Sequence, residues 1–112
     1  MDEVSKPRER IATYAEFWPF YLHEHRNATN RRLHFAGTTL VIALAMAAVA
    51  QHRPMLFAFT PLAGYGFAWA GHFLVERNRP ATFQYPLWSL VSDFRMWFRM
   101  LMGQGWSGEL KP

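Results

Sequence analysis

The hydrophobic pattern divides the chain into an apolar middle and two polar ends. No Asp, Glu, Lys or Arg occurs in residues 33–50 or in residues 54–75. Each run has about 20 residues, the length that an α-helix needs to cross the hydrocarbon core of a bilayer. The short link between the runs predicts a tight hairpin of two spanning helices, at residues 30–50 and 54–77. A hairpin buried in a soluble bundle is the alternative, although so short a chain has few residues left to cover it.

Apolar positions also recur in steps of three and four on both sides of the hairpin, which is the period of an amphipathic helix. One such helix is expected at residues 8–26, with Ser5 and Pro7 suited to its cap and its first turn. The other is expected at residues 86–102, after which the tail from Gln104 is expected to fray.

The expected fold is therefore all-α, in a single domain formed by residues 1–112. We predict a small integral membrane protein in which a two-helix transmembrane hairpin is flanked by N- and C-terminal amphipathic helices that lie at the surface of the lipid bilayer. Small residues at four-residue spacing occur on both spanning helices, and they allow a homo-oligomer without requiring one. These residues are Ala43, Ala47, Gly64 and Ala68.

Charge supports one orientation and excludes one class of partner. The formal net charge is +4, from 12 Lys and Arg against 8 Asp and Glu, and Arg53 is the basic residue in the link. By the positive-inside rule, both hairpin ends and both termini are expected in the cytoplasm, at the inner membrane if the protein is bacterial. The basic residues flank spanning helices and form no patch interleaved with aromatic residues, so no nucleic-acid partner is expected. The absence of cysteine excludes thiolate metal ligands.

Three histidines are expected at one end of the hairpin. His34 lies near the start of the first apolar run and His72 near the end of the second, so an antiparallel pair brings them to the same depth. His25 arrives at the same face from the preceding helix, and Glu76 follows His72 by four residues, on the same helix face. We therefore expect these four side chains to converge. Neutral imidazoles suit Fe, Zn, Cu or Ni, and a set of His and carboxylate ligands with open positions suits non-haem Fe(II).

Two other histidines and one structural interpretation bear on this site. His52 lies in the link at the opposite end of the hairpin and is excluded. His23 lies two residues from His25, so on a helix it points elsewhere and is expected at the surface or at the rim of the site. The structural alternative is that the buried histidines only donate hydrogen bonds to backbone carbonyls, while the pair of His72 and Glu76 seals a helix end.

Two blocks of sequence resemble a known family. The first comprises residues 17–25, FWPFYLHEH, and residues 30–38, NRRLHFAGT. The second comprises residues 64–72, GYGFAWAGH, followed by Glu76, Asn78, residues 80–83 and Asp93. With these blocks, the chain is similar to a family once described as a domain of unknown function. Its characterised fungal member is an endoplasmic-reticulum 2-hydroxy fatty acid dioxygenase.

The resemblance implies an Fe(II)-dependent dioxygenase of fatty-acid α-oxidation, which converts a 2-hydroxy fatty acid and O2 into an acid one carbon shorter. Matching positions make His25, His34 and His72 the metal-ligand candidates, with Glu76 either a fourth ligand or the partner of a ligand. These four residues are also the expected catalytic set. The fungal enzyme is longer and has additional membrane segments. This chain resembles the short bacterial branch, whose substrate need not be the same.

Polar residues around these positions are expected to bind the substrate. A 2-hydroxyl and a carboxylate that chelate Fe(II) would leave a position for O2. Arg31, Arg32 or Arg77 is expected to orient the substrate carboxylate, and Asn30 and Asn78 are expected to hydrogen-bond the ligands or the substrate. The alternative for Arg32 and Arg77 is that they only anchor helix ends.

Two other classes of function stay open. A non-catalytic membrane scaffold or lipid-binding protein would need no metal and would tolerate changes at all three histidines. A zinc-dependent lipid hydrolase would hold zinc and would not require O2. A di-iron membrane hydroxylase or desaturase is excluded, because such enzymes use more histidines than the five in this chain.

Overall fold

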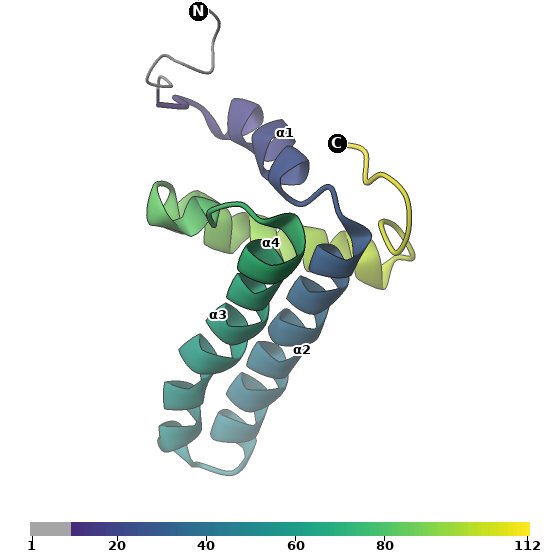
Figure 1. Ribbon diagram of the computed structural model, residues 1–112. Helices are drawn as coiled ribbons and strands as arrows, with labels where there is room; N and C mark the ends of the chain where they lie inside the picture. The colour runs from purple at the N-terminus through teal and green to yellow at the C-terminus, as the bar shows by residue number, and fades with distance from the viewer. Residues whose placement is uncertain (1–9) are drawn as a thin grey trace, which may run out of the picture.

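The computed structural model describes residues 10–112, and the regular structure in this range is helical throughout. Figure 1 shows α2 (Ala28–Ala50) and α3 (Thr60–Ala70) side by side in a long antiparallel hairpin. Helix α4 (Pro86–Leu101) crosses the open end of this hairpin, and α1 (Tyr14–Glu24) lies on the far side of α4. The all-α prediction is confirmed. The arrangement also brings the start of α2 into contact with the residues that follow α3.

The two arms of the hairpin approach closely where a glycine faces the opposite helix. A Cβ on Gly37 of α2 would lie 2.8 Å from the Cβ of Phe67 on α3, closer than real Cβ atoms come. At the tip, His52 adopts a left-handed φ of 54° and Arg53 N donates to Ala48 O at 2.9 Å. This combination ends α2 and turns the chain back along it.

The second arm of the hairpin is not one continuous α-helix. It consists of the 3₁₀ helix η2 (Pro54–Phe59), the α-helix α3 and the π-helix η3 (Gly71–Glu76). Pro61 lies in the first turn of α3, where a proline has no hydrogen bond to lose and therefore starts the helix without kinking it. Within residues 10–112, α2 is the one helix long and apolar enough to cross a membrane. The predicted second spanning helix at 54–77 is not confirmed.

Helix α1 begins later than the sequence pattern suggests. Thr13 caps it, because its Oγ1 accepts a hydrogen bond from Glu16 N at 3.2 Å and donates one to the Glu16 carboxylate at 3.1 Å. Residues 10–13 are not helical, so the helix starts at Tyr14 and not at position 8. Ser5 and Pro7, the expected cap and first-turn residues, lie outside the described part of the chain.

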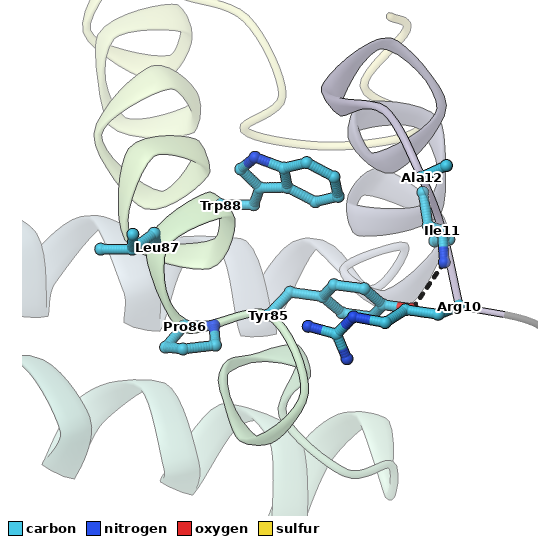
Figure 2. Close-up of a pocket in the computed structure, with 7 residues that line it drawn as sticks. All are labelled: Arg10, Ile11, Ala12, Tyr85, Pro86, Leu87 and Trp88. Carbon is cyan, nitrogen blue, oxygen red and sulfur yellow. Dashed lines mark hydrogen bonds between the residues drawn. The ribbon is translucent and has the colours of Figure 1, made fainter.

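The side chain of Tyr85, at the start of α4, contacts the segment that precedes α1. Figure 2 shows Ile11 N donating to the Tyr85 hydroxyl, at 2.9 Å. The Arg10 guanidinium lies over the same ring, 4.6 Å from its centroid, and donates to Gln84 O at 2.7 Å. Trp88 completes an open groove here, which contains none of the residues predicted to bind metal or substrate.

The buried core lies mainly between α1 and α4. Its members are Phe17, Trp18, Tyr21, Leu22, Ala81, Tyr85, Met96, Met100 and Leu110. Because Leu110 belongs to this core, the C-terminal tail is anchored and does not fray as expected. Arg31 of α2 adds to this anchoring, since it donates to the carbonyls of Gly105, at 2.9 Å, and Gly108.

Large apolar side chains cover the outward face of α4. The exposed residues there are Leu87, Leu90, Val91, Phe94, Phe98 and Leu101. The inward face carries the buried hydroxyls of Ser89 and Ser92. Met96 and Met100 on the same inward face belong to the buried core, so α4 carries apolar side chains on both faces, unlike the surface helix of a soluble protein, which has one apolar stripe. This distribution suits a helix whose outer face contacts lipid.

Candidate metal centre

Three buried histidines meet where α1, α2 and η3 come together. His25 follows α1, His34 lies in the second turn of α2, and His72 lies in the π-helix η3. One ring nitrogen of each lies within 4.8 Å of those of the other two. The ring centroids are 4.5 to 4.9 Å apart, and each pair of rings is nearly perpendicular. The structure thus brings together three of the four predicted ligands.

Backbone carbonyls fix the tautomers of two of these rings. His25 Nδ1 lies 2.7 Å from Tyr21 O, and His34 Nδ1 lies 3.0 Å from Asn30 O. A carbonyl oxygen can only accept a hydrogen bond, so each Nδ1 carries the proton and each Nε2 presents a lone pair. A ligating histidine typically donates its second ring N–H to such an oxygen, which orients the ring and raises its basicity.

The side chain of Asn78 fixes the tautomer of the third ring, that of His72. His72 Nδ1 lies 2.7 Å from Asn78 Oδ1, and the Asn78 amide nitrogen donates to Glu24 O at 2.9 Å, which fixes the orientation of the amide. Arg77 adopts a left-handed φ of 59°, and Asn78 N donates to His72 O at 3.0 Å. This turn folds Asn78 back onto the histidine six residues before it. The π-helix η3 ends at this turn. Helices of this kind are rare and are frequently found at functional sites.

The donor set fits a divalent transition metal. His25 Nε2 and His34 Nε2 lie 3.1 Å apart, and with both protons on Nδ1 these two lone pairs face each other. A cation between them relieves their repulsion. Burial, followed by the charges that His34 and His72 would carry, lowers the pKa of His25 well below its ordinary value. The neutral imidazole that results is the form that binds metal.

Glu76 is not part of this cluster. Its Oε1 accepts a hydrogen bond from Asn27 N, the N-cap residue of α2, at 2.5 Å. A carboxylate is favourable at a helix N-terminus, where the backbone N–H groups and the helix dipole attract negative charge. Glu76 therefore ties the end of η3 to the start of α2. A turn of π-helix contains more residues than a turn of α-helix. A residue four positions after His72 therefore does not lie on the same helix face, as it would on an α-helix.

Arg31 holds the loop that carries His25. Its guanidinium is buried and donates to His25 O and Arg26 O, both at 2.9 Å. With its bonds to Gly105 and Gly108, the group contacts four backbone carbonyls. In this structure it therefore positions the loop and the tail. Within residues 10–112, its hydrogen bonds go to these carbonyls and none goes to a histidine ring.

The remaining predicted residues lie around the centre. Asn30 is fully buried against Gly71, where a Cβ would come within 1.9 Å of the Asn30 Oδ1. Arg32 is exposed and donates to the carbonyl of Trp106, while Arg77 is exposed at the turn after η3. Of the two histidines set apart by sequence, His23 is exposed and lies beside Glu24, and His52 is in the turn at the opposite end of the hairpin.

A small cavity borders all three histidines. Its volume is about 20 Å³, enough for one water molecule. Residues of α3 and of the segment after η3 line its sides, and α4 contributes Ser89 and Asp93. The larger cavity next to it has a volume of about 200 Å³, is lined mainly by apolar side chains, and shares with it His34, Tyr65, Ala68 and Asp93. This second cavity extends along the hairpin as far as Thr60 and Pro61.

The buried Tyr21 and the half-buried Asp93 form a pair that the sequence did not single out for a role. The Tyr21 ring stacks on His25 with centroids 4.0 Å apart, and its hydroxyl donates to Asp93. Burial raises the pKa of Asp93 to about 7, although the hydrogen bond from Tyr21 opposes this shift. Burial and the Asp93 charge raise the pKa of Tyr21 well above its usual value. The available signal was an acidic residue among the apolar positions of α4.

The comparisons with known proteins agree with the sequence blocks. The model of a family described as 2-hydroxy-palmitic acid dioxygenase Mpo1-like matches residues 11–105. This range contains the three histidines, η3 and all of α4. No curated protein and no solved structure matches the chain.

Proposed function

Because the chain belongs to the Mpo1-like family, we propose that it is an Fe(II)-dependent dioxygenase that acts on 2-hydroxy fatty acids and shortens them by one carbon. The observation that carries this proposal is the convergence of three buried histidines, each with its Nδ1 proton bound to an oxygen and its Nε2 free. Three histidines leave coordination positions open for substrate and O2, as non-haem iron oxygenases require.

The proposed ligands are His25, His34 and His72. Bound there, Fe(II) supplies a Lewis acid and a redox centre for O2. Around it, Tyr21 O, Asn30 O and the Asn78 side chain hold the rings in the ligating tautomer. Glu76 and Arg31 do not bind the metal in this proposal. Their hydrogen bonds join the ends of the segments that carry the proposed ligands.

The apolar cavity supports a substrate with a long chain. It adjoins the small cavity at His34 and Asp93 and runs between α2, α3 and α4. A fatty acid with its head group at the histidines would place its chain along this cavity, where burial of apolar surface stabilises it. The exposed apolar faces of the hairpin and of α4 would contact bilayer lipid, with α2 spanning and the histidines on the cytoplasmic side.

The first experiment measures metal content and O2 uptake. The protein is purified in detergent, loaded anaerobically with Fe(II), and then given O2 with either a 2-hydroxy fatty acid or the unhydroxylated acid of equal length. We expect about one iron per chain and O2 uptake with the hydroxy acid alone. His72→Ala should lose both while circular dichroism stays helical, and His23→Ala, at the exposed histidine, should lose neither.

Two results would replace this proposal. Bound zinc without O2 uptake would favour a zinc-dependent lipid hydrolase. No metal under any loading condition, with a His72→Ala variant that behaves like the wild type, would favour a non-catalytic scaffold or lipid-binding protein.

A further inference from the structure

Ser89 is a buried polar group without a partner. The residue is 4% exposed, and no residue in the described range 10–112 forms a hydrogen bond with its Oγ. The residue lines the small cavity that borders the three histidines. Buried hydroxyls nearly always find a partner, because an unpaired one has lost its hydrogen bonds to water. The place where Ser89 lies suggests that a ligand provides that partner.

Asp93 lies one turn further along α4 and lines the same cavity. On an α-helix, residues four apart share a face, so Ser89 and Asp93 lie next to each other on the wall provided by α4. The Tyr21 hydroxyl donates to one oxygen of Asp93. A carboxylate has about four acceptor sites, so Asp93 can accept a further hydrogen bond from a ligand. The wall thus offers one donor and one acceptor side by side.

A 2-hydroxy acid has the complementary groups on adjacent carbons. We propose that Ser89 donates a hydrogen bond to the substrate carboxylate and that Asp93 accepts one from the 2-hydroxyl. This assignment rests on the proposed function and identifies the residues that select the hydroxy acid. The reverse arrangement would place the substrate carboxylate against the Asp93 carboxyl group, where like charges repel whenever Asp93 is ionised.

The way in which the two cavities connect supports the same pairing of Ser89 with the carboxylate and Asp93 with the 2-hydroxyl. Ser89 lines only the small cavity, whereas Asp93 lines both the small cavity and the apolar one. A fatty acid whose chain leaves through the apolar cavity therefore passes Asp93 after Ser89. This matches the order of its atoms, since the carboxyl carbon is at the end and the hydroxyl-bearing carbon lies between it and the chain. An unhydroxylated acid would leave Asp93 facing a methylene group.

The test compares binding of a 2-hydroxy acid and of the unhydroxylated acid of equal length. Titrations use the metal-loaded protein in detergent without O2, and the intrinsic tryptophan fluorescence reports binding because Trp69 lines the small cavity. Ser89→Ala should weaken binding of both acids about 10-fold, since a hydrogen bond to a charged group is lost. Asp93→Asn should remove the preference for the hydroxy acid. In this variant the Tyr21 hydroxyl would donate to the amide oxygen of the new side chain. The amide N–H group would then face the 2-hydroxyl, which in our assignment donates and needs an acceptor.

Ser92→Ala is the matched control, because Ser92 is also buried on α4 but lines neither cavity and bonds to the Tyr14 hydroxyl at 2.9 Å. It should lower thermal stability and leave both affinities unchanged. Ser89→Ala should weaken binding of both acids without lowering thermal stability, since it removes a hydroxyl that has no partner in the free protein. Wild-type affinities in Ser89→Ala, or a preserved preference in Asp93→Asn, would overturn the assignment.

Metal content is measured on the same samples, so that the two proposals fail separately. A wild-type protein that holds iron and prefers the hydroxy acid, with variants that bind equally well, overturns only the roles of Ser89 and Asp93. A wild-type protein that binds neither iron nor the hydroxy acid overturns the proposed function, and the roles of both residues with it.

Discussion

Asn78 is the residue whose side chain orients His72, although it contacts none of the other ring nitrogens of the cluster. Replacing Asn78 by Leu keeps the approximate volume and removes the acceptor for the Nδ1 proton. We expect the affinity for Fe(II) to fall about 10- to 100-fold, as for other partners of metal ligands. A competition titration with a chelator measures this. Arg79→Ala, at an exposed neighbour, should leave the affinity unchanged, and an equal loss in both variants would contradict the role of Asn78.

Asp93 should make the stability of the metal-free protein depend on pH. Its pKa is about 7 in the folded chain and near 4 in an unfolded one, so between these values the folded state retains a proton that the unfolded state releases. The contribution of Asp93 to the free energy of unfolding is therefore full below about pH 4 and is lost as the pH rises through 7.

Denaturation of the wild type and of Asp93→Asn at several pH values isolates this effect. From pH 4 to pH 7 the wild type should lose stability relative to the variant, by an amount on the order of a few kcal/mol. His25, whose pKa is lowered, acts in the opposite direction and destabilises the fold as the pH falls, but it is present in both proteins and cancels in the difference. A difference that does not change with pH would show that Asp93 titrates normally.

Helix α2 and η3 pack so closely beside the histidines that a single methyl group should disturb the contact. Gly71→Ala would place a Cβ 1.9 Å from the Oδ1 of Asn30, and Asn30 is fully buried and cannot move aside freely. We expect a loss of about 1–3 kcal/mol in the free energy of unfolding.

Gly66→Ala is the matched control for this change. No heavy atom lies within 4 Å of a Cβ at Gly66, which is inside α3. Alanine should therefore stabilise the helix by about 0.5–1 kcal/mol. Chemical denaturation of both variants in detergent tests the pair. Equal effects would mean that the contact between Gly71 and Asn30 is looser than the structure shows.

The sequence predicted the number of amphipathic and apolar segments better than the kind of helix each forms. Charge-free runs mark both arms of the hairpin, because burial and lipid contact demand apolar residues whatever the hydrogen-bonding pattern. The same runs do not distinguish α-, 3₁₀- and π-helix, since these differ in which carbonyl each N–H contacts and not in composition. The second arm was therefore predicted to be uniform, and Glu76 was expected beside His72 by a spacing rule that holds only for α-helices.

The histidine cluster was predictable for a related reason. An antiparallel hairpin fixes which residues lie at equal depth, so the positions of His34 and His72 in the two runs were enough to pair them. Ser89 was not predictable, because its signal is a missing hydrogen bond, which exists only in three dimensions. Arg31 was expected at the substrate, but its burial under the C-terminal tail depends on contacts 74 or more residues apart in the chain.

The position of the C-terminal tail relative to the tip of the hairpin tests whether α2 crosses a bilayer. The protein has no cysteine, so single cysteines introduced at Gln51, near the tip, and at Ser107, in the tail, can be labelled selectively. If α2 spans the bilayer, a membrane-impermeant maleimide should label these two variants from opposite sides of sealed, oriented vesicles. Both should react after detergent is added. Labelling of both from one side would mean that α2 does not cross.

Two of the three oxygens that orient the imidazoles belong to the backbone, at Tyr21 and Asn30. A missense mutation replaces a side chain and leaves the backbone carbonyl of the residue in place. Amino-acid substitutions at these two positions therefore do not remove the acceptor for His25 or His34. The third oxygen is encoded by the Asn78 codon itself. Of the three oxygens that accept these Nδ1 protons, the one at Asn78 is therefore the one that a single codon change can remove, so Asn78 is the position at which to seek variants with altered metal preference at the proposed site.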